Sequence, residues 1–297
     1  MNKSDIQSLV SFPIILAIAA GLAYGGSIGG VIAFARLPLF AFCVIIAFVI
    51  QWLAFIPSYI FKTEKFFDIT GSITYATVII IAVVLGPAIS LRSILLMVLV
   101  LIWTSRLGIF LLRRILKAGD DKRFDEIKQS FSRLLGAWTL QGLWVSFTLA
   151  AALAAITIEQ PDTYSAYDLA GLILGILVWI LGFAFEAIAD YQKNKFRSVP
   201  ENKGKFINTG LWSISRHPNY FGEITIWIGI AIIALPSLVT WRFVTLISPV
   251  FVILLLTAIS GVPLLEKRAD KKWGGQEDYE EYKKNTPVLI PKLRFKK

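Results

Sequence analysis

Polar and charged residues with the spacing for ligand chemistry are concentrated in two short segments. In the first, GFAFEAIADYQKNKFRSVP, the residues Glu186, Asp190, Lys193 and Arg197 lie at i, i+4, i+7 and i+11. This spacing places the four side chains on one face of a helix. The two acids lie in or next to apolar sequence, where an acid is costly and indicates a functional site. For Lys193 and Arg197, a ladder of ion pairs reaching the membrane surface explains the residues equally well.

The second segment is SRHPNYFGE, residues 215–223, which contains the only histidine of the chain. Pro218 suits the first turn of a helix, and the apolar run that follows continues that helix. A helix N-terminus offers free N–H groups to an anion, and a guanidinium beside it suits phosphate or carboxylate. A capped helix start with interfacial aromatics is the structural alternative. The candidate cofactor-binding residues here are Arg216, His217, Asn219, Tyr220 and Glu223.

Two more residues outside these segments are candidates for the same site. Arg106, in IWTSRLGIFLLRR, lies within an apolar run, where an arginine requires a partner or a water-filled cavity. Tyr282 belongs to the charged tail, which is predicted either to fold back over the site or to form a solvated amphipathic helix. With one cysteine, Cys43, and one histidine, the chain has neither an intramolecular disulfide nor a metal centre built from several such ligands.

These residues must be positioned by membrane-spanning helices. The chain of 297 residues is 56% hydrophobic, and its mean hydropathy is +0.67. Continuous apolar runs of about 20 residues match a hydrocarbon core of about 30 Å, and they do not alternate as barrel strands do. The fold class is therefore all-α, a polytopic membrane bundle of about eight spans, with seven or nine as alternatives. The predicted spans are 9–31, 38–60, 70–86, 93–113, 134–157, 168–190, 221–238 and 243–265.

The distribution of Lys and Arg predicts the orientation. Almost all of the 30 basic residues fall in the N-terminal segment, alternate loops and the tail. With eight spans, these segments share one side of the membrane, so both termini are expected in the cytosol. The net charge of +10 then indicates anionic lipid or an anionic ligand rather than nucleic acid. A bacterial inner membrane and the endoplasmic reticulum fit equally. The exceptions are Arg36, Arg92, Arg106 and Arg242.

The motifs also suggest a division of labour within one membrane domain, 1–297. Both ligand-binding segments and the charged tail lie in residues 134–297, which are expected to form a cofactor pocket facing the cytosol. The spans of residues 1–133 are mostly apolar, and they are expected to form the substrate side.

The chain resembles a membrane family of unknown function that is related to the steroid 5-alpha-reductases and sterol C14-reductases. FEAIADYQKNKFR, GKFINTGLWSISRHPNYFGEI and the tail LLEKRADKKWGG…YEEYKKNTPVLIP carry the resemblance. It implies a multi-helix fold with a cytosolic NADPH pocket and a lipid-accessible substrate cavity. Asp190 and Arg197 match an acid–arginine spacing that binds the cofactor in the reductases. The Asn-aromatic-x-Gly-Glu segment of the reductases is matched by residues 219–223, and their arginine on an earlier helix by Arg106.

The resemblance fails where the reductases activate their substrate. Their tyrosine one turn before the arginine is Trp103 here, and the Gln-Glu pair expected before Pro57 is absent. The proton donor must therefore be another group. Tyr59, Asp68 and Tyr75 are the polar residues to examine on this side, and the catalytic candidates are Glu223, Tyr59 and Tyr75.

Isoprenylcysteine and phospholipid methyltransferases also share an Arg-His-Pro-x-Tyr motif and a similar tail, and they bind S-adenosylmethionine. The Gly-Glu pair and the Asp190–Arg197 spacing favour the reductase, whereas Arg216-His217-Pro218 favours the methyltransferase. The favoured expectation is an NADPH-dependent reductase of a carbon–carbon double bond in a lipid, sterol or steroid-like substrate. A methyltransferase is the alternative, and a non-catalytic lipid-binding membrane protein is the second alternative.

Overall fold

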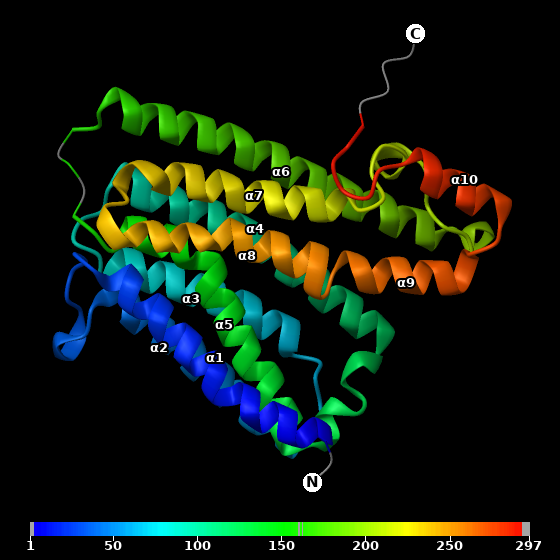
Figure 1. The fold of residues 1–297 in the computed structure, drawn as a ribbon, viewed down its shortest axis with the longest axis horizontal. Coiled ribbons are helices and arrows are strands. Elements are labelled where there is room, and N and C mark those ends of the chain that lie inside the picture. Colours follow the sequence, from blue (N-terminus) through cyan, green and yellow to red (C-terminus); the bar gives the residue numbers. More distant parts are fainter. Residues whose placement is uncertain (1–2, 160, 162, 293–297) are drawn as a thin grey trace. The chain divides into compact units, whose positions relative to one another are not determined.

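The computed structural model describes residues 3–159, 161 and 163–292, and the elements of that part of the chain are helices, without a named strand (Figure 1). The all-α prediction is confirmed. The principal helices are α1 (Lys3–Ser27), α2 (Leu39–Ile60), α3 (Phe67–Val84), α4 (Leu91–Ala118), α5 (Phe131–Ile156), α6 (Ala166–Ser198), α7 (Pro218–Ala234), α8 (Ile247–Leu254), α9 (Val262–Trp273) and α10 (Glu277–Asn285).

Eight segments of the described chain are long and apolar enough to cross a membrane, which confirms the predicted number. The differences lie at their ends. α4 continues to Ala118 and α6 to Ser198, beyond the apolar runs that predicted them, because their last turns are polar helix. Pro249 does not break the last span. It lies in the first turn of α8, where no intrahelical N–H is needed, and the helix is interrupted instead by a π-helical turn, Leu255–Ile259.

The chain divides into two compact units, of which the first contains Met1–Leu169 and Ala234–Ser248. Its most deeply buried helix is α5, which contacts α1, α2, α3 and α4. A run of alanines lets neighbouring helices approach α5 closely, and Ala150 to Ala154 are completely buried. The roles predicted for residues 1–133 and 134–297 stay predictions, and α5 belongs with the earlier helices.

Two arginines placed in loops by the sequence are buried in this unit. Arg92, in the first turn of α4, is completely buried, and its guanidinium lies 2.5 Å from Asp168 of α6. Arg242 is also completely buried, and it donates to the carbonyls of Ile28 and Ala154, at the ends of α1 and α5. Carbonyls at the end of a helix lack intrahelical donors, and the N–H groups of the guanidinium take the place of those donors.

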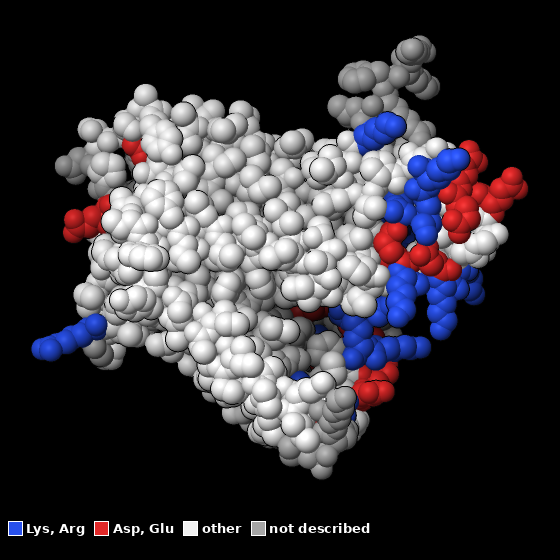
Figure 2. Space-filling model, in the orientation of Figure 1, with Lys and Arg blue, Asp and Glu red and all other residues white. Residues whose placement is uncertain are grey.

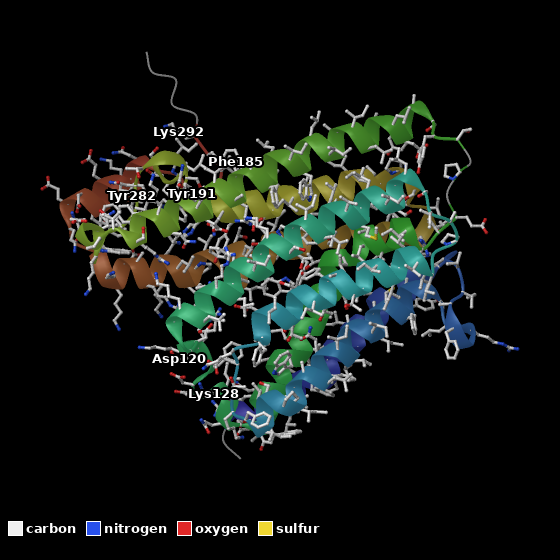
Figure 3. The ribbon with its side chains drawn as sticks, turned by 180° about the vertical axis from the view of Figure 1, so that it is seen from behind. Asp120, Lys128, Phe185, Tyr191, Tyr282 and Lys292 are labelled. Atoms are coloured by element: carbon white, nitrogen blue, oxygen red, sulfur yellow. The ribbon has the colours of Figure 1, made fainter. Side chains whose placement is uncertain are left out.

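The loop between α4 and α5 is held by a buried acid. Glu64 accepts hydrogen bonds from the backbone N–H of Asp121, at 2.8 Å, and from Lys128 Nζ, at 3.1 Å. The bond to Glu64 raises the pKa of Lys128 above its ordinary value. Figure 3 shows Asp120 and Lys128 in this loop. The loop is therefore an ordered part of the first unit despite its charge.

The second unit contains Ala170–Ile233 and Pro249–Lys297. Its helices α6 and α7 run side by side (Figure 1) and meet at glycines spaced seven residues apart on each helix. A Cβ added to Gly229 would lie 2.8 Å from Gly175 O, and one added to Gly222 would lie 2.6 Å from Gly182 O. These four glycines form a seam along which the two backbones touch. Such contact requires residues without a side chain.

The charged residues of this unit gather at one end. Figure 2 shows them around α9 and α10, whereas the surface along α7 and α8 in this view is uncharged. The outward face of α6 is also apolar, with Leu177, Ile180 and Leu181 at least half exposed. An apolar band beside a charged end is the pattern of a helix bundle that extends from lipid into water.

Candidate functional site

The start of α7 brings Arg216 and His217 onto one carboxylate of α9. His217 Nε2 lies 2.7 Å from Glu266 Oε1, and Arg216 Nη1 lies 2.8 Å from Glu266 Oε2. The Arg216 contact is an ion pair by distance, and its angles do not meet those of a hydrogen bond. Glu266 is ionised at neutral pH beside this guanidinium, so it accepts a hydrogen bond from His217 Nε2–H. The carboxylate therefore fixes the orientation of both side chains.

Each of these two residues has a second buried polar atom that Glu266 does not bind. His217 Nδ1 and Arg216 Nε are shielded from solvent and have no hydrogen-bond partner among the described residues. With Nε2–H directed at Glu266, Nδ1 of a neutral His217 is an acceptor, whereas Arg216 Nε is a donor. Buried polar atoms without partners are rare, and they indicate a site for a polar ligand or an ordered water. The ring of Tyr220 stacks beside that of His217, at 5.8 Å between centroids.

The tail folds back on the start of α7, which is one of the two arrangements that the sequence predicted for it. The backbone N–H of Arg216 donates to Pro287 O at 2.9 Å, and Ser215 Oγ donates to Leu289 O at 2.7 Å. A third bond, 2.9 Å long, joins the N–H of Lys292 to Ile214 O. The segment after α10 is thus fixed along residues 214–216, next to His217.

Aromatic side chains join the tail to the loop after α6. Tyr282 Oη donates to Trp212 O at 2.7 Å, and Phe206 packs against the rings of Trp273, Tyr279 and Tyr282. Burial raises the pKa of the Tyr282 hydroxyl above its ordinary value. Since that hydroxyl is bonded to the backbone, its observed contact is structural, and a contact with a cofactor stays a prediction.

Asp270 of α9 extends this cluster toward the charged end. Its Oδ1 accepts from Tyr279 Oη at 3.0 Å and from Lys283 Nζ at 2.6 Å. Burial, and then the bond to Asp270, raise the pKa of Tyr279. The bond to Asp270 also raises the pKa of Lys283. α9 and α10 are therefore joined by charge as well as by aromatic packing.

The four charged residues predicted on one face of α6 all lie in a single continuous helix, but their environments differ. Glu186 and Asp190 are buried, at 3% and 8% exposed, whereas Arg197 is exposed. The ammonium of Lys193 lies 4.4 Å from the ring centroid of Trp212. Gly222 packs on the backbone of Glu186, so the glycine seam brings this acid close to the start of α7. Figure 3 shows Phe185 and Tyr191 on the same helix, at the end of the unit that holds Tyr282 and Lys292.

The remaining residues predicted on α7, Asn219 and Glu223, are half-buried in its first two turns. The other candidates belong to the first unit. Arg106 is half-buried in α4. Tyr75 is buried, and its ring meets that of Trp103 edge-on at 5.1 Å. Tyr59 instead stacks on Phe55 and receives the ammonium of Lys62 over its ring.

Sequence reasoning did not assign Glu266 or Trp212 to the site, and it did not find the glycine seam. Glu266 has a signal in hindsight, because it is the first acid after a long apolar run and stands four residues before Asp270. The glycine seam also has a signal in the sequence, since Gly175 and Gly182 repeat the spacing of Gly222 and Gly229. Pairing Glu266 with His217 needs the tertiary fold, because 49 residues separate them.

Comparison with curated proteins connects the chain to two enzyme classes. It is 28% and 27% identical to the 3-oxo-5-alpha-steroid 4-dehydrogenase 1 of Mus musculus and of Rattus norvegicus, over 41% and 40% of this chain and 42% and 40% of those proteins. It is 32% identical to the probable O-methyltransferase ustE of Ustilaginoidea virens, over 31% of this chain and 36% of that protein. Each match therefore spans less than half of the relative.

No solved structure matches the chain. The resemblance read from the motifs is confirmed, because the relatives include a steroid dehydrogenase beside a methyltransferase. A family model described as "Protein of unknown function (DUF1295)" matches residues 54–286, which is most of the chain. The protein is therefore a member of this membrane family of unknown function.

Proposed function

We propose that the protein is an NADPH-dependent membrane reductase of a carbon–carbon double bond in a lipid, sterol or steroid-like substrate. The observation that carries the proposal is the pair of buried, uncommitted atoms at the start of α7, Arg216 Nε and His217 Nδ1. A nucleotide presents both of the groups that these atoms need. Its phosphates accept from a guanidinium, and its ribose hydroxyls donate to a neutral imidazole.

The charges around this start suit a dinucleotide. Arg216 would hold a phosphate at the α7 N-terminus, where the helix dipole favours negative charge. Lys193 and Arg197 would hold the outer phosphates from the rim of α6, while Asn219 and Glu223 would orient the ribose or the nicotinamide. The folded-back tail would keep water out of the site. A reduced nicotinamide supplies a hydride when bound.

The proton that completes the reduction requires a donor from this chain. Tyr75 is the first candidate to test, because its ring packs against Trp103, which occupies the place of the tyrosine in the related reductases. Tyr59 is the second candidate, and its ring packs against Phe55 and Phe131 and faces the ammonium of Lys62. Glu223 is the remaining candidate, and it belongs to the nucleotide side.

The decisive experiment is to identify the nucleotide that the purified protein binds. The protein would be purified in detergent and denatured, and the released small molecules identified by mass spectrometry. NADPH binding would then be titrated by the fluorescence of the reduced nicotinamide, with Arg216→Met as the test variant and Arg268→Met, an exposed arginine on α9, as its control. Release of S-adenosylmethionine, without binding of NADPH, would overturn the proposal.

A methyltransferase is the second candidate, because the same two atoms also fit its methyl donor. S-adenosylmethionine carries an ammonium and a carboxylate on the same carbon, and these match the acceptor His217 Nδ1 and the donor Arg216 Nε. The relative with the highest of the identities given above is also a probable methyltransferase. Calorimetric titration with S-adenosylmethionine tests this candidate, and absence of binding at millimolar donor disposes of it.

A further inference from the structure

The first unit has a groove between α1 and α2 that contains none of the catalytic or cofactor-binding residues named above. Its volume is about 440 Å³, which is within the range of small-molecule sites. It follows α1 from Leu16 to Ser27 and α2 from Pro38 to Trp52. Small side chains make room for it, since Ala19, Ala20, Ala23 and Ala41 form much of its wall.

Aromatic rings line one end of the groove. Trp52 lies at this end, and the ring of Phe12 stacks on it at 6.2 Å between centroids. Phe48 packs against the other side of Trp52, at 5.8 Å. Trp52 Nε1 donates to Thr139, so its polar atom is already bonded to α5. The aromatic end therefore offers only apolar surface.

The opposite end carries the polar groups. Tyr24 and Ser27 lie there, in the last turn of α1, next to the connection that leads to α2. Ser27 Oγ is shielded from solvent and has no hydrogen-bond partner among the described residues. A buried hydroxyl without a partner indicates a group that the groove is built to receive. The residues that line the groove carry no charge, so this group is neutral.

The length of the groove fits one leaflet of a bilayer. Eleven residue steps of α1, from Leu16 to Ser27, span about 17 Å, and half of a hydrocarbon core is about 15 Å. Because α1 is a membrane span that ends at Ser27, the polar end lies near the membrane surface and the aromatic end near the middle of the bilayer. A hydrocarbon chain anchored by its head would fill this shape.

We propose that this groove is a binding site for a single-chain amphiphile with a neutral hydroxyl or carbonyl head. The chain lies along the alanines of α1 and ends at Trp52, and the head exchanges a hydrogen bond with Ser27. None of the lining residues belongs to the nucleotide site, so this inference does not depend on the reaction proposed above.

The test uses photoaffinity labelling of the whole protein in phosphatidylcholine nanodiscs. The probe is a long-chain alcohol with a photoreactive group near its far end, and unlabelled alcohol is the competitor. We expect saturable labelling, located by mass spectrometry near Phe48 and Trp52. A carboxylic acid of the same chain length should compete more weakly than the alcohol at neutral pH, because the lining offers it no cation.

Three variants distinguish specific binding in the groove from labelling by the surrounding lipid. Ala20→Trp fills the groove and should abolish the competed labelling. Ala17→Trp, on the same helix but outside the lining, should leave it unchanged. Ser27→Ala should weaken competition by the alcohol about threefold to tenfold, because one hydrogen bond is lost.

Two results would overturn the proposal. Labelling that does not saturate, or that Ala20→Trp leaves unchanged, would mean annular lipid only. Cross-links between the α1 helices of two chains, with loss of alcohol labelling on association, would mean that the groove receives a second copy of the protein.

Discussion

Glu266 Oε1 lies 2.7 Å from His217 Nε2, and its other oxygen lies 2.8 Å from the guanidinium of Arg216. One carboxylate thus orients an imidazole and a guanidinium from another helix. Because Glu266 accepts the hydrogen bond from Nε2–H of His217, the other ring nitrogen, Nδ1, is left for the proposed ligand. Glu266 is a positioning residue in this arrangement, and the ligand contacts belong to His217 and Arg216.

Replacing Glu266 by glutamine should therefore weaken nucleotide binding without unfolding the protein. The glutamine amide can turn its N–H₂ toward His217 and force the opposite tautomer, which makes Nδ1 a donor. We expect the Kd for the bound nucleotide to rise about fivefold to a hundredfold, equivalent to about 1–3 kcal/mol, because two buried donors would face each other without an acceptor. Fluorescence titration measures it, and an unchanged Kd with an unchanged Tm would contradict the role of Glu266.

Adding a single methyl group at the glycine seam should push α6 and α7 apart. In Gly222→Ala, the new Cβ would stand 2.5 Å from Glu186 N and 2.6 Å from Gly182 O, so α6 and α7 must separate. Overpacking of this kind costs about 1–3 kcal/mol. The Tm in detergent should fall, and nucleotide binding should fall with it. Gly21→Ala is the matched control, because a Cβ there meets nothing within 4 Å.

Arg242 should contribute more to stability than a surface arginine. Its guanidinium serves the carbonyls of Ile28, Ala154 and Thr157, and each buried carbonyl left unpaired costs about 1–3 kcal/mol. We expect Arg242→Met to lower the Tm clearly, and Arg242→Lys to recover only part of it, because an ammonium lacks the planar fork. Arg268→Met, on an exposed residue, provides the control. Equal Tm values for the two methionine variants would remove this account of Arg242.

Two tyrosines of the tail, Tyr279 and Tyr282, should ionise late in an alkaline titration. The pKa values of Tyr279 and Tyr282 are raised because burial disfavours the phenolate. Their contribution to tail docking is therefore complete below the ordinary tyrosine pKa of about 10, and it is lost as pH rises through the raised values. Ultraviolet absorbance should show a late phase in the native protein, and that phase should be smaller by two tyrosines in the Tyr279→Phe/Tyr282→Phe double variant. A single phase in the native protein would argue against a docked tail.

Tyr75 should affect turnover rather than substrate binding if it donates the proton. Tyr75→Phe keeps the ring that packs against Trp103 and removes only the hydroxyl. We expect kcat to fall about a hundredfold or more with little change in KM, since general acid catalysis contributes about 10²–10⁴-fold. Tyr59→Phe is the control and should retain activity. If Tyr59→Phe lost activity and Tyr75→Phe kept it, Tyr59 would be the proton donor instead.

The sequence by itself determined the membrane class and the number of spans, and it marked the segments that we propose for the chemistry. Continuous apolar runs specify spanning helices because lipid leaves the backbone no other partner for its hydrogen bonds. The start of α7 was equally clear, since Pro218 and the polar residues around it follow local rules. The continuity of α6 through Glu186, Asp190, Lys193 and Arg197 also came from spacing alone.

Only the tertiary structure decided which of these groups meet. The pairing of His217 with Glu266, the burial of Arg92 and Arg242, and the docking of the tail all join residues far apart in the chain. The physical reason is that apolar periodicity specifies a helix but not its partner, since every span has lipid-compatible faces. Partners were chosen instead by close backbone packing at Gly182 and Gly222 and by a few buried charges. These contacts exist only once the helices are assembled.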